Sequence, residues 1–358
     1  MTQMHWSLFI LAAFGLVLAH GLKLPLAGSR AAAVTAFLAG LFVTAMAVKS
    51  LAAANDIGRT TDFDRYVNAA VATAAQDDAP LIVFTGASYS RNGIDPERLT
   101  LALRERGYPH RVVNLSIEAA SILERDAHLQ QFIDLSGRTP QVVFVEVARD
   151  FDTRAAYMFG NSKFNVRAIE QFDLKNAVWT SFGILGGACD GAKGCLLDTA
   201  YLGVHTALNL LNVGLIGGGE PAEEIEAVPA YDPQVEARAK SQPELALQQK
   251  QVSTFQGPQW VRSFRYQQQR RLTAQGVKAI GYYQPPTLAP DARAYLDGLC
   301  AGEFVEHACI SPNDPVLMAQ LNGDHWFDPS HLLDSGTAIY NRWLVEEIIA
   351  SHVLEAAE

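Results

Sequence analysis

The sequence predicts an α/β protein with a parallel β-sheet that is covered by helices on both faces. Three short, almost wholly apolar runs at residues 81–86, 111–116 and 141–147 alternate with helical segments at 95–107 and 121–137. Strands of a parallel sheet give such continuous apolar runs because neither face of the sheet meets water. The alternation therefore predicts a strand–helix–strand–helix–strand core.

Boundary residues support the first helix of this core. The segment 95–107 begins with Asp95, an effective N-cap residue, and Pro96 follows in the first helical turn. Gly107 can end the same helix. These signals separate the helix from the strands on either side of it.

Further elements are expected on both sides of the core. A polar connector and a helix precede it at residues 55–80, and a largely helical stretch lies at 243–276. A fourth strand is expected at 277–286 and a fifth at 303–310. The chain closes with an amphipathic helix at 336–357.

Residues 150–270 interrupt the alternating pattern. Their apolar helical part, residues 150–215, is broken by glycines, Asp198 and His205, which makes it a poor membrane span. An acidic loop rich in Gly and Pro follows at 217–234. We expect an inserted helical cap, or a surface that rests on a membrane.

Two apolar stretches near the N-terminus predict a transmembrane helical hairpin. Residues 6–22 and 31–48 are nearly free of charge, and each is about as long as the shortest membrane-spanning helices. A signal peptide is the alternative for the first stretch, but no basic residue precedes its apolar core. Lys23 and Arg30 lie between the stretches and place this connection in the cytoplasm by the positive-inside rule.

The predicted hairpin divides the chain into two expected parts. Residues 1–54 form a membrane anchor of two transmembrane helices, and residues 55–358 form an extracytoplasmic unit that contains the insert. In a bacterial cell we expect the anchor in the inner membrane and the main unit in the periplasm.

The charge balance argues against a nucleic-acid partner. The formal net charge of the 358-residue chain is -10, and no dense basic patch interrupts it. Proteins that bind nucleic acids instead carry a basic face or stripe.

The four cysteines form two close pairs, Cys189 with Cys195 and Cys300 with Cys309. An even number of cysteines in short local pairs suits two disulfides in an oxidising compartment. Metal binding is the rival interpretation, but neither a Cys-x-x-Cys spacing nor a nearby pair of histidines supports it. We therefore expect disulfides and no metal site.

Ser88 is the candidate nucleophile. It follows strand 81–86 and Gly86, and ligands of open parallel sheets bind beyond the carboxyl ends of the strands. A serine nucleophile needs a base, and the base needs an orienting group. His331 follows Asp328 by three residues, so that one turn can place both side chains together. A turn serine at position 88 and a helix-capping or core histidine at 331 are the alternatives.

Other residues near these motifs have less specific interpretations. His325 adjoins Asp324, but side chains of neighbouring residues point apart, so packing or a place at the cleft rim is expected, and a catalytic role is the alternative. Arg91 is either a contact for an anionic substrate or a solvated loop residue. A structural salt bridge is expected for Arg149 with Asp150. Core or cleft-wall positions are expected for Trp260, Tyr282 and Tyr283.

Four sequence blocks resemble the SGNH (GDSL-type) hydrolase superfamily. The tract GASYSRNGIDPERL around Ser88 resembles the first block of its membrane-associated branch, which includes D-alanyl-transfer and alginate-acetylation proteins. DPSHLLDSG resembles the final block, and VVNLSIEAAS and VVFVEVARD occupy the places of the second and third. The resemblance covers roughly residues 80–150 and 275–350. It implies a flavodoxin-like, three-layer α/β/α domain.

The resemblance also implies roles for individual residues. It makes Ser88 the nucleophile, His331 the base and Asp328 the group that orients it. The backbone N–H of Ser88 is one expected oxyanion donor, and Ser116 or Ala119 stands where the family has a second-block glycine. No residue of VEVARD matches the family's third-block asparagine, and Asn114 is the nearest candidate by type. A missing oxyanion donor typically costs about 100- to 1000-fold in rate.

The function that the resemblance implies is O-acyl transfer, with acetyl as the expected group, to an extracytoplasmic polysaccharide or other glycan. A membrane-bound O-acyltransferase is the implied partner, and no cofactor is expected. A simple esterase, with water as the acceptor, is one alternative. A non-catalytic SGNH-like subunit of a membrane complex is the other.

Overall fold

The computed structural model describes three main parts of the chain together with helical positions scattered between residues 37 and 51. The first part is 62–148 without 119, and the second is 174–210 without 187, 188 and 190. The third is 259–354 without 289–294, 299, 301–307, 313 and 329.

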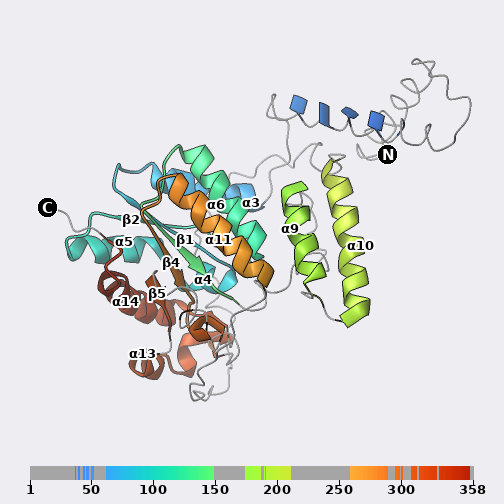
Figure 1. The fold of residues 1–358 in the computed structure, drawn as a ribbon. Helices are drawn as coiled ribbons and strands as arrows, with labels where there is room; N and C mark the ends of the chain where they lie inside the picture. The colour runs from blue at the N-terminus through green and yellow to red at the C-terminus, as the bar shows by residue number, and fades with distance from the viewer. Residues whose placement is uncertain are drawn as a thin grey trace, which may run out of the picture.

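A five-stranded parallel sheet lies at the centre of the fold, with strand order β2-β1-β3-β4-β5 (Figure 1). The strands are Leu81–Thr85 (β1), Arg111–Asn114 (β2), Val142–Glu146 (β3), Ala279–Tyr283 (β4) and Ala308–Ile310 (β5). The five predicted strands are confirmed; the first four are shorter than their predicted ranges, and residues 303–307 of the fifth range lie outside the described residues. Strand β1 is central and pairs with both β2 and β3.

Three helices cover one face of the sheet: Pro96–Glu105 (α5), Pro315–Gln320 (α13) and Asp334–Ala350 (α14). Leu99 of α5 and Leu344 of α14 join Ile82 and Phe84 of β1 in one buried apolar cluster. Ile82 and Phe84 are two residues apart, so the strand pleat directs both to this face.

Three other helices cover the opposite face: Asp62–Ala74 (α3), Ile122–Ser136 (α6) and Gln259–Ala274 (α11). Phe132 of α6 and Leu272 of α11 pack there with Leu81 and Val83, the alternate residues of β1. The sheet therefore lies between two helical layers, as expected for an α/β/α arrangement (Figure 1).

The predicted N-cap of α5 is confirmed, and α6 has a capping box that was not predicted. The Asp95 side chain accepts hydrogen bonds from the backbone N–H groups of Glu97 and Arg98, both at 3.1 Å. Ser121 and Glu124 form a capping box at the start of α6. These contacts fix where each helix begins relative to the strand before it.

Three elements near the carboxyl ends of the strands were not predicted as such. Residues Ser88–Gly93 form a short helix, α4, directly after β1. A 3-10 turn, Gly323–His325 (η3), leads into an antiparallel hairpin of Trp326–Asp328 (β6) and His331–Leu332 (β7). All three are too short for a periodic pattern to reveal them.

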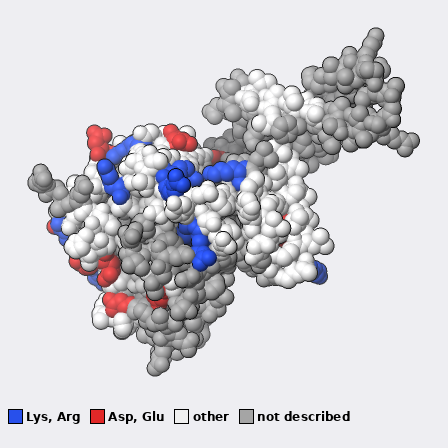
Figure 2. Space-filling view, in the orientation of Figure 1, with Lys and Arg blue, Asp and Glu red and all other residues white. Residues whose placement is uncertain are grey.

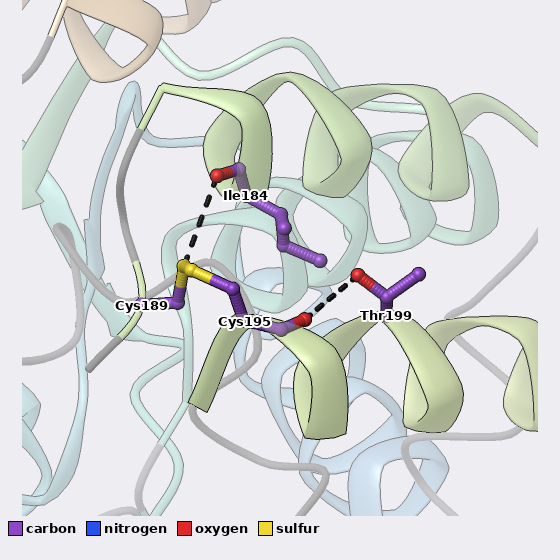
Figure 3. Close-up of a disulfide and its surroundings, with 4 residues drawn as sticks. All are labelled: Ile184, Cys189, Cys195 and Thr199. Atoms are coloured by element: carbon purple, nitrogen blue, oxygen red, sulfur yellow. Dashed lines mark hydrogen bonds between the residues drawn. A yellow bond between two sulfur atoms is a disulfide. The ribbon is translucent and has the colours of Figure 1, made fainter. Parts of the chain in front are cut away.

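The predicted helical insert contains two described helices, Leu174–Leu185 (α9) and Gly191–Leu210 (α10), which lie side by side (Figure 1). The disulfide Cys189–Cys195 joins the segment after α9 to the first turns of α10 (Figure 3). The second predicted disulfide, Cys300–Cys309, is also present. Both pairings are confirmed, and they suit an oxidising, extracytoplasmic location.

The predicted membrane anchor falls largely outside the described residues. The stretch 6–22 is not described, and 31–48 is described only at scattered helical positions. Among the described residues, no helix combines the length and apolar character needed to cross a bilayer. The transmembrane hairpin stays a prediction.

Candidate active site

Ser88 lies at the carboxyl end of β1, as the first residue of α4. Gly86 makes the preceding turn possible, because a Cβ atom there would collide with the carboxylate of Glu146 and the side chain of Ser90. The Ser88 residue is only 7% exposed. Its hydroxyl is therefore held in a largely buried position just beyond the carboxyl end of β1.

His331 reaches Ser88 from 243 positions further along the chain. The Nε2 atom of His331 lies 2.9 Å from the Ser88 hydroxyl oxygen. The Nδ1 atom of the same ring lies 2.8 Å from each carboxylate oxygen of Asp328. The three side chains thus form one continuous hydrogen-bonded series of hydroxyl, imidazole and carboxylate.

The β6–β7 hairpin explains how Asp328 and His331 come together. Asp328 ends β6 and His331 begins β7, so the tight turn brings the two side chains to the same side. The Asp328 carboxylate also accepts hydrogen bonds from the backbone N–H groups of Ser330, at 2.7 Å, and His331, at 2.9 Å. These two contacts hold the carboxylate in the position in which it contacts the imidazole.

The pKa of Asp328 reflects two opposing effects. Burial raises the pKa of the carboxyl group, whereas the His331 ring and the two backbone N–H groups lower it. The lowering effects win, so the pKa lies below the ordinary value. Asp328 is therefore ionised at neutral pH and is suited to stabilise a protonated His331.

Hydrogen bonds from helix α14 connect the β6–β7 hairpin to α4, the helix that begins with Ser88. The Thr337 hydroxyl donates to the backbone oxygen of Asn92, and the Asn341 amide donates to that of Gly93, both at 2.7 Å. The Asn341 side-chain oxygen accepts from the backbone N–H of Asp95. Because α14 directly follows β7, these bonds hold His331 and the Ser88 helix in one frame.

Glu146 is the principal site residue that the sequence reasoning missed. This fully buried carboxylate ends β3 and accepts hydrogen bonds from the backbone N–H groups of Ala87, at 3.0 Å, and Ser90, at 3.2 Å. It also accepts from the Ser90 hydroxyl. The available signal was a single glutamate within the apolar run VVFVEV, where an unpartnered charge would be costly.

Tyr283 completes the buried network beneath the nucleophile. Its hydroxyl donates to the Ser90 hydroxyl oxygen at 2.6 Å, and Ser90 in turn donates to Glu146. Burial raises the pKa of Tyr283 well above its ordinary value, and the negative charge of Glu146 adds to this effect. The phenol is thus a neutral donor, and the core position predicted for Tyr283 matches its complete burial.

The four candidate oxyanion donors differ in availability. Within the described residues, nothing accepts a hydrogen bond from the Ser88 backbone N–H, as is usual for the first turn of a helix. The Asn114 amide instead donates to the backbone oxygens of Ser90 and Ile94, and its oxygen accepts from the Ser116 N–H. Asn114 thus stabilises α4 and occupies the Ser116 N–H. Ala119 lies outside the described residues.

The remaining candidate residues have local partners. Arg91 lies 3.7 Å from the carboxylate of Glu118, and it also donates to the side chain of Asn92. The His325 ring contacts the Ser335 hydroxyl at 2.9 Å rather than Asp324. Arg149 and Asp150 lie outside the described residues. Trp260 and Tyr282 are buried, as predicted for core positions.

The Tyr89 ring flanks the imidazole, with 5.5 Å between its centroid and that of His331. It thereby limits the rotation of the imidazole on one side. All four cysteines are disulfide-bonded, which leaves no thiol for the rival metal-binding interpretation.

Comparisons with known proteins do not assign this chain to a family. No family model matches it, and neither does any curated protein.

Proposed function

We propose that this protein is a serine-dependent O-acyltransferase, with Ser88 as nucleophile, His331 as general base and Asp328 as the group that orients the imidazole. The observation that carries the proposal is the continuous series from the Ser88 hydroxyl through His331 to Asp328. A hydroxyl, an imidazole and an ionised carboxylate in this order form the apparatus that acyl transfer requires.

The first half-reaction forms an ester on Ser88. As the hydroxyl oxygen attacks the acyl carbonyl carbon, its proton passes to Nε2 of His331, and the carbonyl oxygen gains negative charge. The Ser88 N–H can donate to this oxygen. The tetrahedral species collapses when the bond to the leaving group breaks, and His331 returns its proton to that group. Asp328 stabilises the imidazolium throughout.

The second half-reaction restores the enzyme. His331 removes a proton from an acceptor hydroxyl, whose oxygen attacks the ester carbonyl. The new ester leaves, and Ser88 regains its proton from His331. The acceptor decides whether the chain is a transferase or an esterase, because a glycan hydroxyl gives an acylated glycan and water gives a free acid.

The extracytoplasmic setting and the resemblance to the SGNH acyl-transfer branch favour a glycan acceptor and an acetyl group. Two disulfides suit an oxidising compartment outside the cytoplasm. The predicted hairpin at 6–22 and 31–48 would anchor the enzyme in the inner membrane, beside a membrane-bound O-acyltransferase that supplies acyl groups.

The small number of free oxyanion donors among the described residues supports a second candidate, a non-catalytic subunit with the same fold. The Asn114 amide and the Ser116 N–H have other hydrogen-bond partners, which leaves the Ser88 N–H as the donor free of a partner among the described residues. An incomplete oxyanion hole slows acyl transfer by about 100-fold or more.

Turnover of an aryl acetate with and without soluble oligosaccharides distinguishes these functions. A transferase releases the phenol faster when the oligosaccharide is present and gives an acetylated sugar, and the Ser88→Ala variant gives neither. Hydrolysis that the oligosaccharide does not affect would instead indicate an esterase. A folded wild-type chain without turnover would support the non-catalytic subunit.

A further inference from the structure

Helices α9 and α10 form a helical hairpin that exposes large apolar side chains and buries polar ones. Seven of its large apolar side chains are exposed: Val178, Phe182, Leu185, Leu196, Leu197, Tyr201 and Val204. On α9, residues 178, 182 and 185 recur at helical spacing and therefore form one outward stripe. A water-facing helix normally places its charged residues there.

Most of the side chains that are buried in the hairpin are polar, and Leu202 is the apolar exception among the described residues. Asn176 and Thr180 of α9 are buried, and so are His205 and Asn209 of α10. Polar side chains between helices and apolar side chains outside them are typical of helices that are surrounded by lipid. The pattern is thus the opposite of that in the two sheet-covering layers.

The hairpin is also attached firmly to the rest of the fold. Trp179 packs edge-on against Phe264 of α11, with 5.4 Å between ring centroids, and Ile184 joins the same buried cluster. The outward stripe therefore has a defined direction relative to the sheet. Helix α11 lies between this hairpin and the sheet in Figure 1.

The disulfides indicate the kind of compartment that contains the α9–α10 turn. Cys189–Cys195 closes the turn between α9 and α10, and Cys300–Cys309 attaches β5 within the sheet domain. Disulfides of this kind are typical of oxidising compartments and rare in the cytosol. We therefore expect the turn and the sheet domain in one compartment, which argues against a hairpin whose turn passes through the bilayer.

A lipid surface fits the outward face better than a protein partner does. Residues 174–210 contain only four charged side chains, Lys175, Asp190, Lys193 and Asp198, whereas protein interfaces have a polar rim and regular hydrogen bonds. Figure 2 shows this side of the molecule as almost free of charged groups. Tyr201 supplies an amphipathic ring of the kind found at the membrane–water interface.

We propose that the exposed apolar face of α9 and α10 inserts into the outer surface of the phospholipid bilayer. The hairpin is then a second, peripheral contact with the membrane, separate from the predicted N-terminal spans. This proposal does not depend on the serine chemistry, and it holds whether or not Ser88 is a nucleophile.

Site-specific photocrosslinking of the full-length chain tests the proposal. The protein is reconstituted into vesicles of phosphatidylethanolamine and phosphatidylglycerol, with benzoylphenylalanine at position 182 or 196. Positions 101 and 135 serve as matched controls, because Leu101 and Leu135 are 56% and 55% exposed, close to the 56% of Phe182. Both controls lie on sheet-covering helices, so they report the background of nonspecific lipid contact.

Mass spectrometry of the crosslinked peptides gives the outcome. We expect phospholipid adducts at 182 and 196 that exceed those at 101 and 135 by at least about tenfold. Adducts at 182 and 196 with another protein chain, or lipid adducts no more frequent than at the controls, would overturn the proposal.

A second comparison guards against misfolding of the labelled variants. Phe182→Glu in the chain with benzoylphenylalanine at 196 should lower lipid adducts several-fold, and Leu135→Glu in the same chain should not. An intact Cys189–Cys195 disulfide in every variant shows that the hairpin has formed. Equal adduct yields with Phe182→Glu and Leu135→Glu would contradict insertion of this face.

Discussion

Glu146 accepts a hydrogen bond from the backbone N–H of Ala87, and this contact links the end of β3 to the turn that presents Ser88. The same carboxylate oxygen accepts from the N–H of Ser90. The backbone on both sides of the candidate nucleophile is thus fixed by one buried side chain. Strand β3 consequently positions Ser88 through hydrogen bonds to the residues on either side of it.

Glu146→Leu should destabilise the fold by about 2 kcal/mol or more, because it leaves two backbone N–H groups and the Ser90 hydroxyl without their acceptor. Glu146→Gln retains a carbonyl oxygen and should cost less. Urea denaturation of both variants measures the difference in free energy of unfolding. Equal stability of the Leu and Gln variants would show that the acceptor is unimportant.

Asp328→Asn should reduce turnover of an aryl acetate by about 1000-fold or more, because an amide can stabilise the wrong imidazole tautomer. The control is Asp324→Asn, since His325 contacts Ser335 and is not part of the series from Ser88 to Asp328. We expect that variant to retain most of its activity. If Asp328→Asn lost less activity than Asp324→Asn, Asp328 would not be the carboxylate that orients the imidazole.

The lowered pKa of Asp328 predicts a specific acid sensitivity. Because the folded-state pKa lies below the ordinary value of 3.8, the ionised carboxylate stabilises the fold above that pH. This stabilisation is lost as the pH falls from about 3.8 through the folded-state pKa. The difference in unfolding free energy between wild type and Asp328→Asn should therefore shrink over this range. A difference that stays constant from pH 6 to pH 3 would contradict the predicted linkage.

Loss of the Cys300–Cys309 disulfide should destabilise the sheet domain. The cysteines are nine positions apart and pack against the core cluster on the α3, α6 and α11 face. Closing a loop of this length is worth about 2 to 3 kcal/mol in the chain-entropy account. The Cys300→Ser/Cys309→Ser double variant should show this loss in urea denaturation.

The matched double variant Cys189→Ser/Cys195→Ser removes the bond at the hairpin turn. It should affect unfolding of the sheet domain less, since neither cysteine belongs to the two clusters that flank the sheet. The reverse order of effects would show that the hairpin, rather than β5, limits the stability of the domain.

The sequence was most informative where long patterns and strong local signals coincide. The apolar runs at 81–86 and 141–147 predicted buried strands, and Asp95 predicted the start of α5. The spacing of Asp328 and His331 predicted their pairing, because three residues span one tight turn. Their meeting with Ser88 was inferred from the resemblance and the sheet topology.

The network below the site could not be predicted in this way. The acceptor role of Glu146 depends on how closely the turn after β1 approaches the end of β3, which no local pattern encodes. Asn114 was considered as an oxyanion donor from its residue type alone. The tertiary fold instead directs its amide to the backbone oxygens of Ser90 and Ile94.

The most direct test of the account is the labelling of the folded full-length chain with a fluorophosphonate, followed by peptide mass spectrometry. The account predicts one adduct, on the hydroxyl of Ser88, with the labelling rate reduced by about 100-fold or more in the His331→Ala variant. An unlabelled Ser88 in the folded wild-type protein, or an equal rate in His331→Ala, would contradict it.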